Sequence, residues 1–333
     1  MKAEILALVR AGGPRSEEEF EAAALALFRW QVAHNAEYAA FAAGSHPERW
    51  SEIPAVPVGL FRELALTCFP PSAARVAFHT SGTTGAPGVH RLMDTEVYDL
   101  GAASHAAAVI GPIPTEGVSL VSPAPTSSLG HMCRSFAPRL RWYFTPELGL
   151  DAEGAVAALR AATRAQFVPA TAFALAELIA PDDAPPPAPV RLPRGSVVMV
   201  TGGFKGRRRA VDEGALVARA SAFFEGAAVV GEYGMTELSS QLWAANLGDP
   251  YVPPPWMRVY AADPLTGEPA EEGVLRFVDL ANHGSVLAIE TQDLGRVLPD
   301  GRVQLFGRSL EAPPRGCSLT VEEAGARGVH VGR

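Results

Sequence analysis

The chain has 333 residues, enough for one large domain or two ordinary ones with a sizeable buried core. Hydrophobic residues make up 48% of it and charged residues 19%, a balance that excludes wholesale disorder. The formal net charge of −8 argues against nucleic acid as the main partner, because a phosphate backbone requires a clustered basic surface.

The cysteines and the apolar runs indicate the compartment. Cys68, Cys133 and Cys317 are odd in number and widely separated, which suits neither a disulfide framework nor a metal cluster, and free thiols suit a reducing cytoplasm. The sequence does not start with a basic and apolar leader, and no apolar run reaches the ~18 residues of a membrane helix. We therefore expect a cytoplasmic protein without stable membrane insertion.

The first 45 residues have the pattern of helices that pack against a core. Ser16 is a candidate N-cap, with Glu19 reaching back to it in a capping box. The side chains that follow at helical spacing are Phe20, Ala24, Leu27, Phe28 and Gln31. Residues 53–61 are expected to be extended, because each proline biases the preceding residue away from the helical region.

Residues 76–88 (VAFHTSGTTGAPG) combine a short apolar strand with a loop of hydroxyls and glycines. Glycine lets consecutive N–H groups turn inward, and these N–H groups with Ser and Thr hydroxyls make a concave site for a polyphosphate. The candidate residues are Thr80, Ser81, Gly82, Thr83, Thr84 and Gly85. A polar hairpin or a strand-to-helix turn is the alternative. A Walker loop is excluded, since Val89 and His90 follow Gly88 where that motif has Lys-Ser/Thr.

From residue 94 onward, short apolar strands alternate with helices, which is typical of an α/β sheet. Helices are expected at residues 94–110, with an acidic cap, and at 151–164, 171–180 and 209–224; strands are expected at 118–122, 140–144, 167–170, 196–201 and 227–231. The proline-rich residues 181–189 are interpreted as a surface loop within one domain. Alternation and turns between residues 274 and 306 predict a smaller β-rich subdomain.

Three further segments carry chemistry suited to a nucleotide: residues 201–207 (TGGFKGR), 231–237 (GEYGMTE) and 291–296 (TQDLGR), the last followed by Asp300-Gly301 and Gly307-Arg308. Together with the TSGTTG loop they resemble, in order, the signatures of the adenylate-forming superfamily: T-S-G-T-T-G, Y-G-x-T-E and T-G-D-x-G…G-R. The GGFKGR run, an RGCSL segment at residues 315–319 and a short tail are similar to the acyl-protein synthetase (LuxE-like) branch.

The resemblance implies an α/β fold, that of the large domain of adenylate-forming enzymes, in which mixed sheets are flanked by helices. Residues 1–52 then form an N-terminal helical segment, residues 53–308 the adenylation (AMP-binding) domain with its smaller β-rich subdomain, and residues 309–333 a short C-terminal tail. Only 25 residues follow Arg308. The C-terminal lid domain that most relatives carry is therefore expected to be missing.

The resemblance also implies roles at the nucleotide site. The loop from Thr80 to Gly85 surrounds the β and γ phosphates, Thr236 lies near the α-phosphate, and Glu237 binds Mg²⁺, which takes one or two carboxylates plus phosphates. Further nucleotide-binding residues are Gly202, Gly203, Glu232, Tyr233, Gly234, Met235, Asp293 and Arg308, with Tyr233 stacking on adenine and the last two at the ribose. Structural alternatives are a turn for Asp293, a core position for Tyr233 and a helix-start charge for Glu237.

Two departures from the family pattern bear on the mechanism: Gly88 stands where the superfamily has a lysine, and the lid lysine has no counterpart. Lys205 is the candidate replacement cation, and Lys205→Ala is expected to slow adenylate formation while nucleotide binding stays nearly intact. His131 falls where relatives keep a His or an aromatic residue at the mouth of the acyl pocket. Cys317, beside Arg315, is the candidate thiol that takes the acyl group. The alternatives are an ordinary exposed lysine, a half-buried histidine and an inert cysteine.

The function expected from these features is ATP-dependent activation of a carboxylic acid, fatty or other acyl, to an acyl-adenylate. The acyl group then moves to a thiol on a protein, such as a reductase or carrier protein, and the cofactors are ATP and Mg²⁺. One alternative is a lid-less acid–CoA ligase, which uses free coenzyme A. The other is a non-catalytic adenylation-domain homologue that acts as a scaffold or regulator.

Overall fold

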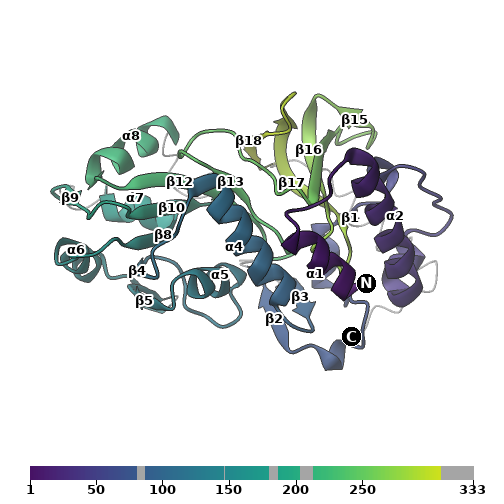
Figure 1. Cartoon of the computed structure of the whole chain (residues 1–333), viewed down its shortest axis with the longest axis horizontal. Helices are drawn as coiled ribbons and strands as arrows, with labels where there is room; N and C mark the ends of the chain where they lie inside the picture. The colour runs from purple at the N-terminus through teal and green to yellow at the C-terminus, as the bar shows by residue number, and fades with distance from the viewer. Residues whose placement is uncertain (81–86, 146, 180–186, 203–212, 309–333) are drawn as a thin grey trace. The chain divides into compact units, whose positions relative to one another are not determined.

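The computed structural model describes residues 1–80, 87–145, 147–179, 187–202 and 213–308 (Figure 1). The chain forms two compact units, each built from separate stretches of sequence. The first unit comprises Met1–Gly101, Met235–Ser240 and the chain from Pro253 onward; the second comprises Ala102–Gly234 and Gln241–Val252. The predicted α/β architecture with mixed sheets and flanking helices is confirmed.

Three helices begin the first unit: α1 (Lys2–Arg10), α2 (Glu17–His34) and α3 (Ala36–Phe41). The Ser16 hydroxyl accepts the N–H of Glu19 at 3.2 Å, as predicted. The Glu19 carboxylate, however, accepts the N–H of Arg15 at 2.7 Å, one residue further back than a capping box requires. The buried residues of α2 are those expected from helical spacing, Phe20, Ala24, Leu27, Phe28 and Gln31, so one face of this helix packs into the core.

The extended conformation expected for residues 53–61 is found in only part of that segment. Strand β1 (Val56–Pro57) is extended and pairs in parallel with β17 (Ala288–Val297), but a 3₁₀ helix, η2 (Val58–Arg62), follows it. No proline restrains residues 58–61, and the helical turn buries Leu60 and Phe61. Two further 3₁₀ helices are η1 (Trp50–Glu52) and η3 (Pro71–Ala73).

The β-rich part of the first unit is a six-stranded sheet in the order β1-β17-β16-β14-β15, with β18 also paired to β17. Its other strands are β14 (Met257–Ala262), β15 (Pro269–Ala270), β16 (Glu272–Asp279) and β18 (Val303–Arg308). The strands expected between residues 274 and 306 are therefore present. The β-rich part of the sequence begins earlier than expected, at β14, where Met257, Val259 and Ala261 alternate inward, and β1 joins the sheet from residues 56–57.

A separate hairpin of β2 (Val76–His79) and β3 (Val89–Leu92) carries the glycine- and hydroxyl-rich loop. The two strands are antiparallel, with Phe78 opposite His90. This arrangement corresponds to the hairpin that the sequence left open as an alternative. Residues 81–86 of the loop lie outside the described residues, so the phosphate-binding role stays a prediction.

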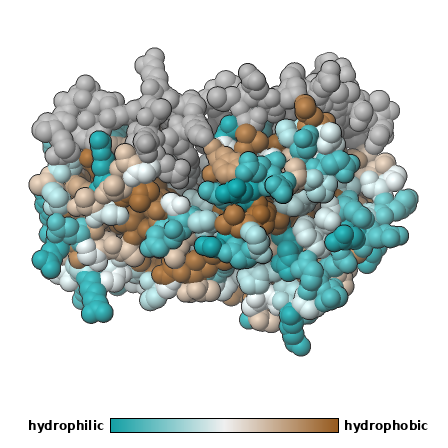
Figure 2. All heavy atoms as spheres, turned by 90° about the horizontal axis from the view of Figure 1, so that it is seen from above, coloured by the Kyte–Doolittle hydropathy of each residue, from teal (hydrophilic) through white to brown (hydrophobic). Residues whose placement is uncertain are grey.

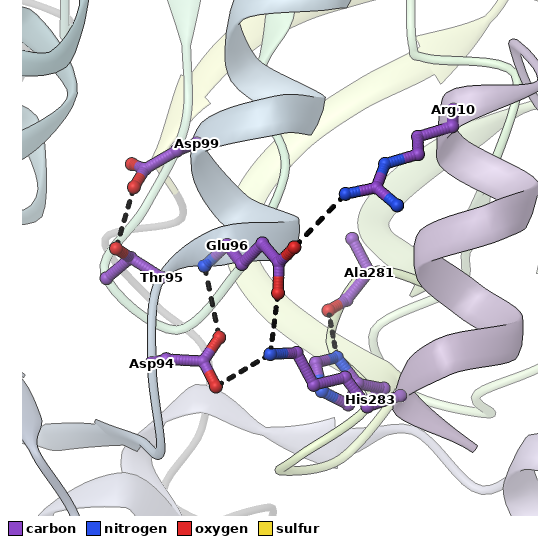
Figure 3. A network of polar contacts seen from close by, with 8 residues as sticks. Arg10, Asp94, Thr95, Glu96, Asp99, Ala281 and His283 are labelled. Atoms are coloured by element: carbon purple, nitrogen blue, oxygen red, sulfur yellow. Dashed lines mark hydrogen bonds and ion pairs between the residues drawn. The ribbon is translucent and has the colours of Figure 1, made fainter.

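Helix α4 (Glu96–Ile110) begins with the acidic cap that the sequence predicted. An Asp94 carboxylate oxygen accepts the N–H of Glu96 at 3.1 Å. Lys2 Nζ lies 2.8 Å from an Asp94 oxygen and 2.9 Å from a Glu96 oxygen, and Arg10 lies 3.1 Å from Glu96. Figure 3 shows Arg10 pointing toward Glu96. Opposite charges thus join α1 to the start of α4, although exposed pairs of this kind contribute only ~0.2–1 kcal/mol each.

The second unit contains a sheet in the order β13-β12-β10-β8-β4-β5. Neighbouring strands are parallel except for β12 and β13. The strands are β4 (Glu116–Ser119), β5 (Arg139–Trp142), β8 (Phe167–Thr171), β10 (Val197–Thr201), β12 (Ala228–Tyr233) and β13 (Leu242–Ala244). Short pairs are β6 (Phe144–Thr145) with β7 (Gly149–Leu150), and β9 (Val190–Arg191) with β11 (Phe224–Glu225).

Besides the part of α4 from Ala102 onward, the described helices of the second unit are α5 (Ser128–Phe136), α6 (Ala152–Arg160), α7 (Ala172–Ile179) and α8 (Glu213–Phe223). Apolar residues of α6, α7 and α8 form one core with Val118, Val168 and Val198 of the sheet. Helix α6 ends four residues before the expected end at residue 164, because the N–H of Ala162 bonds to Leu159 in a tight closing turn. The start of the helix expected at 209–224 lies outside the described residues.

Hydrophobic side chains reach the visible face in several places among hydrophilic ones (Figure 2). The large hydrophobic residues exposed in the described part of the chain are Met93, Leu148, Phe173 and Leu265. They belong to four separate segments, so no continuous apolar surface is inferred from them. None of the described helices has the length and apolar character needed to cross a membrane.

Candidate active site

The base of the hydroxyl-rich loop is closed by Thr80 and Gly88. The N–H of Thr80 donates to the Gly88 carbonyl at 2.9 Å, and the N–H of Gly88 donates to the Thr80 hydroxyl at 2.8 Å. A Cβ at position 88 would lie 3.2 Å from the Thr80 methyl group and 3.4 Å from Phe61, so the glycine leaves little room for a longer side chain. Ser81, Gly82, Thr83, Thr84 and Gly85 lie outside the described residues.

The turn at Thr236 and Glu237 is attached to the same hairpin. The Thr236 hydroxyl lies 3.5 Å from the carbonyl oxygen of His79, at the end of β2. On β3, His90 Nδ1 lies 2.8 Å from the Thr236 carbonyl oxygen. A carbonyl only accepts, so Nδ1 carries the proton. Burial lowers the pKa of His90 to about 4, which keeps the ring neutral.

Glu237 is the buried carboxylate of this turn, with only 8% of its surface exposed. Burial raises the pKa of the Glu237 carboxyl, the guanidinium groups of Arg308 and Arg62 oppose this rise, and Asp293 adds to it. Two acids and two arginines therefore lie within electrostatic reach of one another in the first unit. Arg62 was not among the residues expected from the sequence.

The donor set suits Mg²⁺ bound together with phosphate. In the part of the chain that the structure describes, no group of three or more His, Cys, Asp or Glu side chains is arranged to hold a metal ion alone. Mg²⁺ in nucleotide sites commonly takes one or two carboxylates and completes its shell with phosphate oxygens and water. Glu237, with Asp293 nearby, fits that requirement.

Asp293 and Arg308 are brought together by the β17–β18 hairpin. They are cross-strand partners, and Arg308 Nε lies 3.3 Å from an Asp293 carboxylate oxygen. The Thr291 hydroxyl accepts the N–H of Asp293 at 3.0 Å and donates to the Leu275 carbonyl at 2.9 Å. The spacing of the T-x-D…G-R signature is thus explained by one hairpin that pairs its two ends.

The second unit carries the remaining described candidates. Gly202 follows β10 with a φ of +77°, a conformation that residues with a side chain rarely adopt. Glu232 is paired in register with Thr201, and burial raises the pKa of its carboxyl to about 7 while the Thr201 hydroxyl opposes that rise. A Cβ at Gly234 would lie only 2.6 Å from a Glu232 carboxylate oxygen, so a side chain there would displace that carboxylate.

Two aromatic candidates have partly structural surroundings. The Tyr233 ring is buried and lies 6.1 Å from the ring of Tyr251, so the core alternative describes its packing. His131 is half-buried in the first turn of α5, which is capped by the Ser127 hydroxyl. Met235 is half-buried beside Gly234. The nucleotide or substrate contacts expected for these residues stay predictions.

Two of the three cysteines, Cys68 and Cys133, lie in the described part of the chain, and both are partly or fully buried. Cys68 donates its thiol to the Ser285 carbonyl at 3.3 Å, and burial raises the pKa of this thiol to about 12. Cys133 is fully buried, and burial also raises its pKa. Burial therefore disfavours the thiolate, the nucleophilic form, at both positions. Cys317, like Lys205 and Gly203, lies outside the described residues.

A buried polar group behind Glu237 was not recognised from the sequence. The Asn282 amide donates to the Glu237 carbonyl at 2.9 Å and accepts the Ser239 hydroxyl at 2.9 Å. Asp279, fully buried, accepts the Ser239 N–H at 3.1 Å and the Ser240 hydroxyl at 2.8 Å. The available signal was the group of polar residues Asp279, Asn282, His283 and Ser285 between two apolar strands, but that pattern is equally typical of an exposed turn.

No protein-family model matches the sequence, and no curated protein matches it significantly. Solved structures match the fold. The structure of 2-hydroxyisobutyryl-CoA ligase in the postadenylation state with 2-HIB-AMP has a TM-score of 0.66 at 16% identity, covering 89% of this chain and 68% of that chain. An open conformation of that ligase with 2-HIB-AMP and CoA has a TM-score of 0.65 at 16% identity, covering 89% and 76%.

ATP-bound MatB from Rhodopseudomonas palustris has a TM-score of 0.50 at 17% identity, covering 74% of this chain and 50% of that one. The fold is that of the large domain of adenylate-forming ligases. The chain spans about half the length of the MatB structures it matches. At these identities the likeness concerns the fold, and the activity has to be argued from the residues.

Proposed function

We propose that this protein activates a carboxylic acid with ATP and Mg²⁺ to form an acyl-adenylate and then transfers the acyl group to a thiol. The observation that carries the proposal is the grouping of three signature segments in the first unit. The Thr236–Glu237 turn is attached to the β2–β3 hairpin, and the Asp293–Arg308 pair acts electrostatically on Glu237. Segments about 60 and 150 residues apart in sequence thus contribute to one region.

The chemistry explains why these residue types are needed. A carboxylate oxygen attacks the α-phosphorus of ATP, and pyrophosphate leaves with the electrons of the broken P–O bond. Two anions must approach each other, so the protein has mainly to position groups and to neutralise charge. Arg308 and Arg62 supply positive charge near Glu237, whose carboxylate would hold Mg²⁺. The bound ion would offset the negative charge of the phosphates.

The other roles are proposed from the signatures. The loop from Thr80 to Gly85 binds the β and γ phosphates, and Thr236 contacts the α-phosphate. Asp293 accepts the ribose hydroxyls, and Arg308 lies beside them. At the nucleobase, Tyr233 stacks on adenine, and Gly202 and Gly203 leave room for the adenine ring. The neighbouring residues Glu232, Gly234 and Met235 also bind the nucleotide. His131 lies at the mouth of the acyl pocket, and Lys205 supplies a cation to the reacting phosphate.

The domain boundaries belong to the same proposal. Residues 53–308 act as the adenylation domain, preceded by the helical segment 1–52 and followed by the tail 309–333. Within this scheme Cys317 takes the acyl group as a thioester before a partner protein, a reductase or carrier, receives it. The LuxE-like assignment rests on the GGFKGR and RGCSL segments.

A second candidate acceptor is free coenzyme A. It is favoured by the matched solved structures, whose names describe CoA ligases. The two acceptors differ in a simple observable. A CoA ligase releases an acyl-CoA when coenzyme A is added, whereas transfer to Cys317 adds the mass of the acyl group to the protein itself.

The test of the proposal is acid-dependent ATP–pyrophosphate exchange over a panel of acids that varies chain length and aromatic character. We expect exchange that requires both Mg²⁺ and one class of acid. ATP binding without exchange for every acid would instead support a scaffold or regulator. Intact-mass measurement after incubation with ATP, Mg²⁺ and the active acid then tests Cys317, with Cys317→Ser as the matched control.

A further inference from the structure

Two buried side chains each hold one of the two consecutive carbonyl groups of the Thr236–Glu237 turn. His90 donates from Nδ1 to the Thr236 carbonyl at 2.8 Å, and Asn282 donates from its amide to the Glu237 carbonyl at 2.9 Å. We propose that His90 and Asn282 are positioning residues for adenylate formation, which orient Thr236 and Glu237 through the backbone. The inference rests on the proposed function and extends it to two residues that none of the four signatures contains.

The contacts of His90 link this turn to the phosphate loop. His90 is 1% exposed, and its ring meets the ring of Phe61 edge-on at 5.9 Å. It lies on β3 two residues after Gly88, which closes the base of the loop with Thr80. The other strand of the hairpin reaches the same turn, since the His79 carbonyl lies 3.5 Å from the Thr236 hydroxyl. Hairpin and turn are therefore joined on both strands.

The contacts of Asn282 fix the other side of the turn. Asn282 is 1% exposed, and its amide nitrogen donates to the carbonyls of Glu237 and Val286, at 2.9 and 2.8 Å. Its amide oxygen accepts the Ser239 hydroxyl at 2.9 Å. Both ends of the amide are thus in use, and only one orientation of the side chain satisfies them all. An aspartate of the same shape has no N–H to give to the Glu237 carbonyl.

The backbone is the appropriate place to control these residues. Thr236 and Glu237 are proposed to touch the α-phosphate and Mg²⁺ with their side chains, so the backbone carbonyls are the groups through which the protein can hold both residues during the reaction. Fixing the carbonyls leaves only the side-chain torsions to be ordered when the nucleotide binds. A misplacement of about 1 Å at a reacting centre costs about 100-fold in rate. Neither His90 nor Asn282 needs to contact the nucleotide to have such an effect.

The experiment compares four variants in the pyrophosphate exchange assay, with calorimetric ATP binding and thermal unfolding measured on each. His90→Leu and Asn282→Asp remove the donors, while His90→Asn keeps an N–H donor close to the position of Nδ1. His105→Leu is the matched control, because His105 is a buried histidine of the second unit whose Nε2 pairs with the Val252 carbonyl at 2.9 Å.

We expect His90→Leu and Asn282→Asp to lower kcat about 100-fold, with the Kd for ATP changed less than about threefold. His90→Asn should recover most of that loss, and His105→Leu should leave kcat within about threefold of wild type. If the wild type is active and kcat is unchanged in His90→Leu and Asn282→Asp, the positioning role is overturned and the proposed function is not affected. Absence of exchange in the wild type with every acid overturns the proposed function and this inference with it.

A second measurement needs no variant to fold. ¹⁵N spectra of the histidine-labelled protein distinguish the two neutral tautomers of an imidazole, and a donor to a carbonyl from Nδ1 requires the Nδ1–H form. We expect one histidine signal of that form that disappears in His90→Asn. An Nε2–H tautomer for His90 removes the hydrogen bond to Thr236 and overturns its positioning role.

Discussion

Asp293 and Arg308 form a cross-strand pair in which the Asp293 side chain is mostly buried and the Arg308 side chain is exposed to solvent. Arg308 Nε lies 3.3 Å from the Asp293 oxygen, while the Asp293 side chain is 18% exposed and the Arg308 side chain is 61% exposed. A ligand that offers hydroxyl groups to one residue and negative charge to the other matches this arrangement. A ribose attached to a phosphate is such a ligand.

Asp293→Asn keeps the shape of the side chain and removes its charge. We expect the Kd for Mg²⁺–ATP to rise about 10-fold, the effect of losing one hydrogen bond to a charged group. Calorimetry measures this change directly. Asp300→Asn is the control, because Asp300 pairs with Arg302 at 2.8 Å at the turn of the same hairpin. Equal changes of Kd in the two variants would contradict a role for Asp293 at the ribose.

The Thr80 hydroxyl should contribute to ATP binding and to stability, because it accepts a hydrogen bond at the base of the phosphate loop. The N–H of Gly88 donates to that hydroxyl at 2.8 Å, and Thr80→Val removes the acceptor while Thr80→Ser keeps it. We expect Thr80→Val to weaken ATP binding about 10-fold and to lower the free energy of unfolding by about 1 kcal/mol. Thr80→Ser should stay close to wild type in both. Similar behaviour of the two variants would mean that the hydroxyl does not organise the loop.

Much of the fold could be predicted because periodicity and turn residues act locally. The buried face of α2 and the Asp293–Arg308 hairpin follow from the spacing of residues in the sequence alone. The errors arose where tertiary packing overrides local preference. Residues 58–61, which no proline restrains, turn into a 3₁₀ helix that buries Leu60 and Phe61 and do not continue the extended chain that the prolines favour at the residues before them.

The candidate site could be predicted only as far as its signatures reach. Glu237 stands in a motif, whereas His90 and Asn282 act on it from segments that carry no motif of their own. A histidine in a short strand and an asparagine in a turn have many uses, and only the fold brings them to consecutive carbonyls. The same holds for Arg62, whose charge reaches Glu237 from the 3₁₀ helix η2, which carries no signature.

Glu237→Gln tests the metal role of the buried carboxylate. Gln keeps the size of the side chain but cannot supply the charge that favours Mg²⁺. We expect kcat for exchange to fall at least about 100-fold and the Mg²⁺ concentration for half-maximal rate to rise, since one preorganised charge at a reacting centre is worth this much. Binding of ATP without Mg²⁺ should change little. An unaltered Mg²⁺ dependence would assign the metal to other ligands.

Cys68 and Cys133 should be inert in the folded protein. Burial raises the pKa of Cys68 to about 12, so about one molecule in 10⁴ carries the thiolate at pH 8. Treatment with iodoacetamide at this pH, followed by peptide mass spectrometry, should leave both cysteines unmodified, whereas urea-unfolded protein reacts at all three. Rapid native labelling of Cys68 would show that its thiol is not buried in solution. With both excluded, any acyl thioester on the protein has to be on Cys317.

The pH dependence of stability should carry a signature of His90. Its pKa is about 4 in the folded state, lowered by burial, against 6.5 when unfolded, so the unfolded state binds the proton more readily between these values. The contribution of His90 to the free energy of unfolding is therefore fully present above pH 6.5 and is lost as the pH falls towards 4. Asp279 and Glu232, whose pKa values burial raises to about 6 and about 7, have the opposite slope. The total profile can therefore be flat.

A difference between two proteins isolates the His90 contribution, because Asp279, Glu232 and the neighbouring His283 are present in both. Urea unfolding of wild type and His90→Asn at pH 7 and pH 5 provides this difference. On acidification, the wild type should lose about 2 kcal/mol more of its free energy of unfolding than the variant does. The difference in free energy of unfolding between the two proteins could instead be the same at both pH values. His90 would then take up a proton in the folded protein as readily as in the unfolded chain. The neutral Nδ1–H ring on which the contact with Thr236 was argued would then not be the form present at pH 5.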